Sequence, residues 1–183
     1  MMKAAGVIFS VHVPSVDEDE VQSALIAEGA TPARIADALA ELKAVTVSRR
    51  AAGLVLGADQ ILVTSNGICL DKPGDRDAAG TQLRRLAGTE HLLIAAAVIA
   101  ENGAAIWRAS DTARLTMRHL SDSFIADYLE REGEAVMGCV GTYRIEGLGA
   151  QLFTKVTGDP FVIQGLPLLS VLSYLRTRGE LAA

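Results

Sequence analysis

The sequence has little of what marks secreted, membrane-spanning or zinc-binding proteins. Its 183 residues include only two cysteines, Cys69 and Cys139, too few for a disulfide framework or a zinc site. We expect both to be reduced thiols in or near the core. Half of the residues are hydrophobic, yet no apolar run approaches the length of a membrane span. The N-terminus has no basic region followed by an apolar stretch, so we expect no export and a cytoplasmic location.

Basic blocks and histidine clusters are also missing. The net charge is −5, and no cationic face is evident of the kind that duplex nucleic acid requires. The three histidines are scattered, with no spacing typical of a metal site or a catalytic triad. The lack of basic blocks argues against a duplex nucleic-acid partner, and the lack of long apolar runs argues against a membrane partner. They do not argue against a small phosphate ligand, which needs only a local cationic pocket.

The pattern of apolar residues predicts one α/β domain spanning residues 1–183. Helical spacing and capping residues predict helices over 20–28, from the Thr31 cap to about residue 46, over 75–87, over 121–133 and from Pro167 onward. Apolar runs and alternation predict strands over 7–13, 91–100, 106–117 and 152–156. Met1 to Ala5 is predicted to be the last turns of a helix that Gly6 closes.

The central stretch, Leu54 to Pro73, carries the strongest signal. A short apolar run ends at Gly57-Ala58-Asp59-Gln60, a second run follows, and Asn66-Gly67 turns the chain back. The pattern predicts a buried strand with a carboxylate at its end, then a β-hairpin that delivers Asp71-Lys72-Pro73. An acid and a lysine brought together in this way suit an anionic substrate held through a divalent metal.

A second stretch, GCVGTYRIEGLGAQ from Gly138 to Gln151, has four glycines, which indicate close backbone approaches or positive φ. Its Gly-Leu-Gly is a weak signal alone, because it lacks the strand and helix context of a dinucleotide site. Taken with GADQ, DKP, the VDE of residues 16–18, the LKA of residues 42–44 and the GLPL of residues 165–168, it resembles the Maf family of septum-formation-inhibitor-like nucleoside triphosphate pyrophosphatases. The resemblance covers nearly the whole chain from Ala5 onward.

The resemblance implies a fold similar to inosine-triphosphate pyrophosphatases, with a mixed twisted sheet, helices on both sides and two lobes around a cleft. It implies hydrolysis of a nucleoside triphosphate to the monophosphate and pyrophosphate with Mg²⁺ or Mn²⁺. Asp59 would be the catalytic base, and Glu18 and Asp59 would hold the metal. Lys43 and Lys72 would bind phosphate oxygens. Family members are often homodimers.

Each of these residues has a plainer interpretation. Glu18 can be an acidic residue at a helix N-terminus, favoured by the helix dipole. Lys43 and Lys72 can be solvated, as lysines usually are. Asp59 can be a turn or capping carboxylate that accepts from local backbone. The residues alone leave these alternatives open, and the family resemblance favours the functional roles.

Gln60 and Glu146 have side chains suited to reading a nucleobase edge, since a carboxylate can accept hydrogen bonds from the N1 and exocyclic amine of guanine. In the family, Gln after GAD together with Glu in the EGLG motif is similar to the branch that hydrolyses 7-methyl-GTP. The branch acting on dTTP and UTP carries Thr and Gln there. The alternative for Glu146 is a local cap or a pair with Arg144.

One departure from the family is the S-x-S-x-R-R loop, which is expected before the first helix and is absent from this sequence. Losing its paired arginines should cost transition-state stabilisation on the order of several kcal/mol. We therefore expect the domain to lack its first strand and phosphate loop and to have reduced activity. A nucleotide-binding or regulatory protein that has lost catalysis is the alternative.

Overall fold

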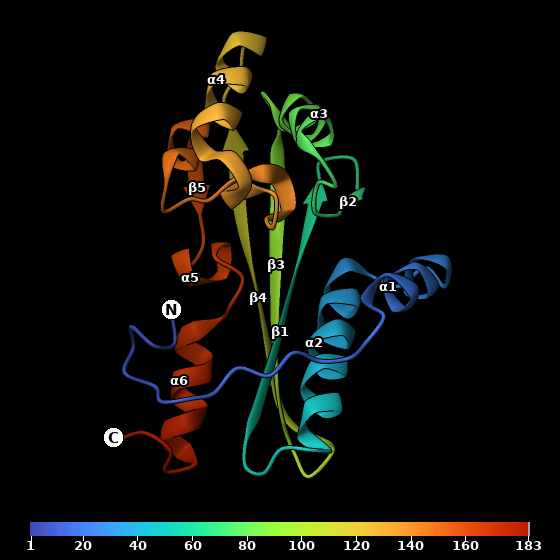
Figure 1. Ribbon diagram of the computed structural model, residues 1–183, viewed down its shortest axis with the longest axis vertical. Helices are drawn as coiled ribbons and strands as arrows, with labels where there is room; N and C mark the ends of the chain where they lie inside the picture. The colour runs from blue at the N-terminus through green and yellow to red at the C-terminus, as the bar shows by residue number, and fades with distance from the viewer. Residues whose placement is uncertain (183) are drawn as a thin grey trace. The chain divides into compact units, whose positions relative to one another are not determined.

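The computed structural model describes residues 1–182 and contains a five-stranded sheet in the order β2-β1-β3-β4-β5 (Figure 1). The strands are β1 (Val55–Thr64), β2 (Cys69–Leu70), β3 (Glu90–Glu101), β4 (Ala104–Met117) and β5 (Phe153–Thr157). The α-helices are α1 (Glu18–Ala27), α2 (Pro32–Ser48), α3 (Arg76–Leu86), α4 (Asp122–Glu132), α5 (Pro160–Ile163) and α6 (Leu168–Thr177). Three 3₁₀ helices, η1 (Gly133–Val136), η2 (Val140–Thr142) and η3 (Leu148–Leu152), lie between α4 and β5.

The chain divides into two compact units, each with its own core. Unit 1 comprises residues 1–60, 94–111 and 165–183, of which 183 lies outside the described residues, and unit 2 comprises residues 61–93 and 112–164. Strands β1, β3 and β4 therefore contribute residues to both units. The predicted site residues are divided in the same way.

In unit 1, helix α2 packs directly on β1. Thr31 caps the helix by accepting from the Arg34 amide at 3.3 Å, and Pro32 occupies the first turn, as the sequence predicts. A Cβ at Gly57 would lie 2.3 Å from the Ala40 carbonyl oxygen and 2.6 Å from the Ala44 nitrogen. Glycine at position 57 therefore lets the helix backbone approach the strand. This close contact sets the height of α2 over the sheet.

Helix α6 covers the other face of the sheet in unit 1. Alternate strand residues point to opposite faces, so Gln60 points away from the face on which Gly57 meets α2. Gln60 lies 3.9 Å from where a Cβ at Gly165 would be, just before α6 begins. On β4, Trp107 stacks on Tyr174 of α6 with ring centroids 5.0 Å apart. The prediction of helices on both sides is thus confirmed within this unit.

Unit 2 contains the hairpin, two helices and the glycine-rich stretch. Asn66-Gly67 turns the chain between β1 and β2, which pair antiparallel with Leu62 opposite Leu70. Asp75 caps α3 and Ser121 caps α4, both as predicted. The fully buried core side chains of this unit include Leu83, Leu86, Leu93, Leu115, Ile125 and Leu152.

Three expectations are wrong. The sheet is antiparallel and not mixed, and its β3–β4 turn of only Asn102-Gly103 can join antiparallel strands alone. Residues 7–13 form no strand, and their side chains Ile8, Val11 and Val13 are exposed. Met1 to Ala5 forms hydrogen-bonded turns closed by Gly6 at φ 79°, where the sequence predicts helix.

Candidate functional site

The predicted catalytic carboxylate, Asp59, lies inside β1 and not at the end of a strand. The sequence suggests a break at Gly57-Ala58-Asp59-Gln60, yet the strand continues through it. Helix α2 covers Gly57. Asp59 lies two residues further along, on the same face of the strand, and its charge is paired with Lys43. Small and polar residues therefore do not interrupt the strand here.

Lys43 joins Asp59 to Glu18. Its ammonium lies 2.6 Å from Asp59 Oδ1 and 2.7 Å from Glu18 Oε2, so one cation bridges two carboxylates. The side chain of Asp59 is 12% exposed, that of Lys43 19% and that of Glu18 39%. Burial lowers the pKa of Lys43, but hydrogen bonds and charge from Asp59 and Glu18 outweigh it and raise the pKa above 10.5. Lys43 is therefore charged across the physiological range.

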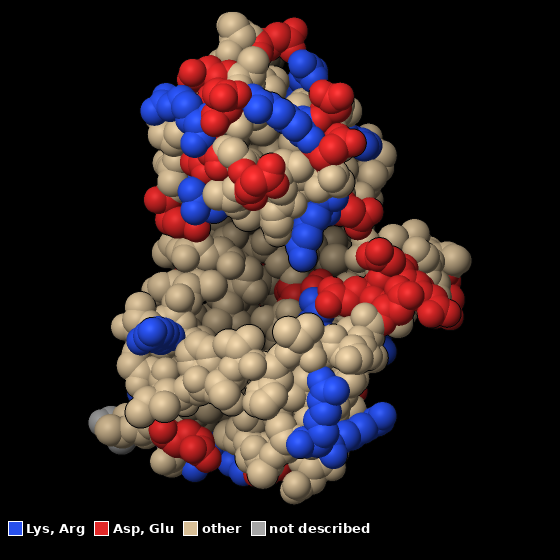
Figure 2. All heavy atoms as spheres, viewed as in Figure 1, with Lys and Arg blue, Asp and Glu red and all other residues tan. Residues whose placement is uncertain are grey.

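Glu18 reaches this position because it opens α1. Asp17 caps that helix by accepting from the Glu20 amide at 3.0 Å, and Glu18, Asp19 and Glu20 fill the first turn. Acidic side chains accordingly gather over α1 on the face seen in Figure 2. Glu18 lies in an acidic first turn, as its plainer interpretation predicts, and it also meets Lys43.

The remaining predicted residues lie as follows. Gln60 follows Asp59 on β1 and faces Gly165 within unit 1. In unit 2, Lys72 and Glu146 are both exposed, and the charges of both shift the pKa of the Cys139 thiol. Burial raises the pKa of Cys139 most, the charge of Glu146 raises it further, and Arg144 and Lys72 lower it. Lys72 and Glu146 are therefore electrostatic neighbours of the same side chain.

The carboxylate that pairs with Arg144 is Glu132, which the sequence does not single out. Glu132 Oε2 accepts from Arg144 Nη2 at 2.8 Å, and its side chain is 2% exposed. The local partner expected for Arg144, Glu146, contributes only through its charge, which raises the pKa of Arg144 less than the hydrogen bond and charge of Glu132 do. Glu132 lies in the last turn of α4, just before Gly133. In the sequence it looks like an ordinary exposed helix residue, so nothing in the sequence predicts its burial or its pairing with Arg144.

Both cysteines are free thiols, as expected. Among residues 1–182, no group of three or more His, Cys, Asp or Glu side chains is arranged to hold a metal ion. In the same residues, no helix is long and apolar enough to cross a membrane.

Comparison with known proteins decides the family. A sequence model described as "Maf-like protein" matches residues 1–178. The chain belongs to the Maf family. It is 48% identical over 182 residues to a protein of Paramagnetospirillum magneticum, covering 99% of this chain and 93% of that one. It is 48% identical over 181 residues to a protein of Caulobacter vibrioides, covering 99% and 90%.

A third relative, from Jannaschia, is 48% identical over 183 residues, covering 100% of this chain and 92% of the relative. The first two relatives are named nucleoside triphosphate pyrophosphatase, and the Jannaschia protein is named nucleoside triphosphate pyrophosphatase 1. Membership of the Maf family agrees with the motif resemblance from the sequence, while the branch within the family is not distinguished by these names.

Proposed function

We propose that the protein hydrolyses nucleoside triphosphates to the monophosphate and pyrophosphate. One observation carries the proposal, namely the half-buried Asp59 carboxylate held beside Lys43 and Glu18. Attack on a phosphorus requires a positioned water, an acceptor for its proton and charge to neutralise the phosphates. Asp59 supplies the acceptor and Lys43 supplies positive charge at the same place. Membership of the Maf family supports the same reaction.

The residues fit a divalent metal. Mg²⁺ is usually bound by one or two carboxylates plus substrate phosphates, so Glu18 and Asp59 with a triphosphate make a suitable set. Bound there, the metal would neutralise phosphate charge and lower the pKa of a water. Lys43 already bridges the two carboxylates, so a cation is favoured at this position.

The protein's own residues divide the work. Asp59 would accept the proton of the attacking water on its carboxylate, whose Oδ1 accepts from Lys43 at 2.6 Å in the nucleotide-free protein. A phosphate oxygen offers Lys43 an alternative anion, so substrate binding would weaken this contact. Lys72, exposed on the segment after β2, would bind phosphate as a second point charge.

For the base, we propose a preference for 7-methyl-GTP read by Gln60 and Glu146. A glutamate carboxylate can accept hydrogen bonds from both the N1 and the exocyclic amine of guanine, whereas a pyrimidine base offers it fewer such donors. The exposed position of Glu146 leaves its carboxylate available for such contacts. A preference for dTTP or UTP is the alternative within the same reaction. A homodimer belongs to the proposal through the family resemblance.

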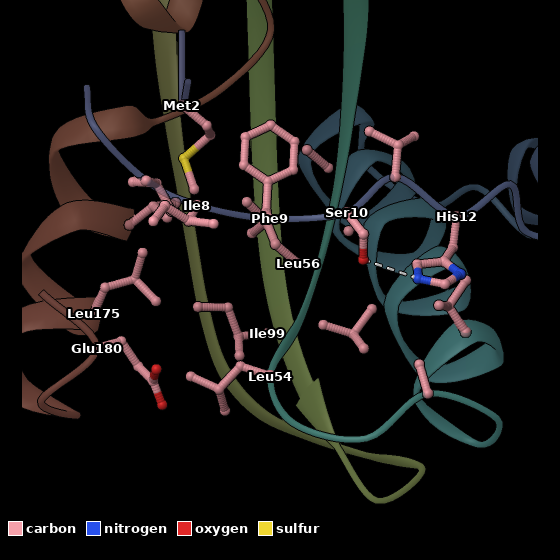
Figure 3. Close-up of a pocket in the computed structure, with 18 of the residues that line it drawn as sticks. Met2, Ile8, Phe9, Ser10, His12, Leu54, Leu56, Ile99, Leu175 and Glu180 are labelled. Carbon is pink, nitrogen blue, oxygen red and sulfur yellow. Dashed lines mark hydrogen bonds between the residues drawn. The ribbon is translucent and has the colours of Figure 1, made fainter. Parts of the chain in front are cut away.

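A groove in unit 1 supports the expectation that a further strand belongs beside β1. The groove has a volume of about 720 Å³ and is lined by Phe9, Leu54, Leu56, Ile99 and Leu175 (Figure 3). Beta2 pairs with β1 only at Leu62 and Val63, which lie in unit 2. We propose that the first strand and phosphate loop of the family would lie here.

The alternative function is a nucleotide-binding or regulatory protein without catalysis. The cluster of Lys43, Asp59 and Glu18 favours it, because Lys43 pairs with both carboxylates without any metal. Pyrophosphate release measured with Mg²⁺ or Mn²⁺ across guanine, adenine and pyrimidine triphosphates separates the two. Turnover of any nucleotide supports the enzyme. Tight binding with no turnover supports the binding protein, and no rise in melting temperature with any nucleotide contradicts both.

A further inference from the structure

The glycine-rich segment of unit 2 is held at four residues, three before a short loop and one after it. Tyr128 of α4 donates to the Thr142 carbonyl at 3.2 Å, and His91 Nε2 lies 2.7 Å from the Tyr143 hydroxyl. Arg144 and Leu148 are then both bound by Glu132. The segment is fixed on either side of residues 145–147, and these three residues form the apex of the loop.

One carboxylate closes this loop from both ends. Glu132 Oε2 accepts from Arg144 Nε at 3.2 Å and from Nη2 at 2.8 Å. Glu132 Oε1 accepts from the Leu148 amide at 2.9 Å. Since the side chain of Glu132 is 2% exposed, water does not compete for these contacts. A buried charge is costly unless paired, and here all of its donors come from the loop.

The loop backbone is shaped to admit that carboxylate. A Cβ at Gly147 would lie 3.0 Å from Glu132 Oε1, so a side chain there would crowd the carboxylate. A Cβ at Gly149 would lie 2.3 Å from the Arg144 carbonyl oxygen, which makes the turn possible only with glycine. The Gly147 amide donates to that carbonyl at 3.1 Å. Both glycines of the Gly-Leu-Gly motif are thus explained by the closed loop.

Glu146 is the exposed side chain at the apex of the loop. We propose that Glu132 is a positioning residue for nucleobase selection, because its buried carboxylate closes the loop and fixes the direction of Glu146. This inference rests on the proposed function, since it needs Glu146 to contact the base. Glu132 itself would touch no substrate and would act only through the loop.

Glu132→Gln is the sharpest variant. It keeps the side-chain volume but leaves one acceptor oxygen, so the amide can serve Arg144 or the Leu148 amide and not both. Glu130→Gln is the matched control, because Glu130 lies on the same helix and pairs with Arg76 at 2.7 Å on the surface. Glu132→Asp, which keeps both acceptors on a shorter stem, is the second variant if the first does not fold.

The measurement is kcat/KM for 7-methyl-GTP divided by kcat/KM for UTP. Glu132→Gln should change this ratio at least tenfold, chiefly through KM for 7-methyl-GTP, and Glu130→Gln should change it less than twofold. In a Glu146→Gln background, Glu132→Gln should have less than a twofold further effect on the ratio. An unchanged ratio in Glu132→Gln, or effects of the two substitutions that multiply, would overturn the inference. Wild-type protein that turns over no nucleotide would instead overturn the proposed function.

Discussion

The ammonium of Lys43 lies 2.6 Å from Asp59 Oδ1, on the face of β1 that α2 covers, and it also reaches Glu18. The cation that neutralises the candidate base therefore comes from the protein itself. A divalent metal bound at Glu18 and Asp59, as proposed, would compete with Lys43 for the same two carboxylates. That competition determines what happens when either the lysine or the base is changed.

Lys43→Met should raise the affinity of the nucleotide-free protein for Mn²⁺ at least tenfold, because it removes the cation that bridges Asp59 and Glu18. The same change should lower pyrophosphate release, because a phosphate-binding charge is lost. Titration followed by electron paramagnetic resonance of free Mn²⁺ measures the first effect. Lys155→Met, at an exposed position on β5, is the control and should change neither. Equal Mn²⁺ affinity in Lys43→Met and wild type would contradict the competition.

Gly57→Ala should destabilise the protein by about 1–3 kcal/mol or more, because the added methyl meets backbone atoms of α2 that cannot rotate away. The helix must shift, and Lys43 shifts with it. Urea unfolding gives the free energy of unfolding, and Gly74→Ala is the control because nothing lies within 4 Å of its added methyl. A neutral Gly57→Ala would show that α2 does not rest on β1 at this point.

The buried His91 should make stability depend on pH. Burial lowers its pKa to about 4, although the charge of Glu90 acts in the other direction. In the unfolded state His91 has a pKa near its ordinary 6.5, so as the pH falls the unfolded state binds a proton before the folded state does. Stability contributed by His91 is complete above pH 6.5 and is lost as pH falls toward 4, to a limit of about 3 kcal/mol.

Thermal or urea unfolding between pH 7 and pH 4.5 checks this dependence. His91→Gln should flatten the curve in that range, even if it lowers stability at pH 7 by disturbing the contact with Tyr143. His12→Gln, on the exposed N-terminal segment, should leave the slope unchanged. A slope that survives in His91→Gln would assign the proton to another group.

Local patterns in the sequence predict the elements well. The caps Thr31, Asp75 and Ser121, the Asn66-Gly67 turn and the strand starting near His91 all occur as expected, because each depends on nearby residues. The prediction of a strand over 7–13 is wrong, because a segment with an alternating pattern becomes a strand only where a partner strand is available to pair with it. The prediction of a break at Asp59 fails for a related reason, since its charge is paired with Lys43, 16 positions away in the sequence.

The candidate site shows the same limit. Family motifs single out Glu18, Lys43 and Asp59, and the structure brings these three together. No sequence pattern predicts that Lys43 bridges the two carboxylates, because the contact depends on how α1 and α2 meet β1. Glu132 is missed for the same reason, since its importance comes from donors 12 and 16 residues farther along the chain.

The most direct test of the account is the rate of pyrophosphate release by Asp59→Asn. Asparagine keeps the size of the side chain but cannot accept a proton at neutral pH, so the rate should fall about 10²–10⁴-fold while nucleotide binding persists. Asp127→Asn, at an exposed position on α4, should retain the wild-type rate. A rate for Asp59→Asn within threefold of wild type would contradict the assignment of Asp59 as the base.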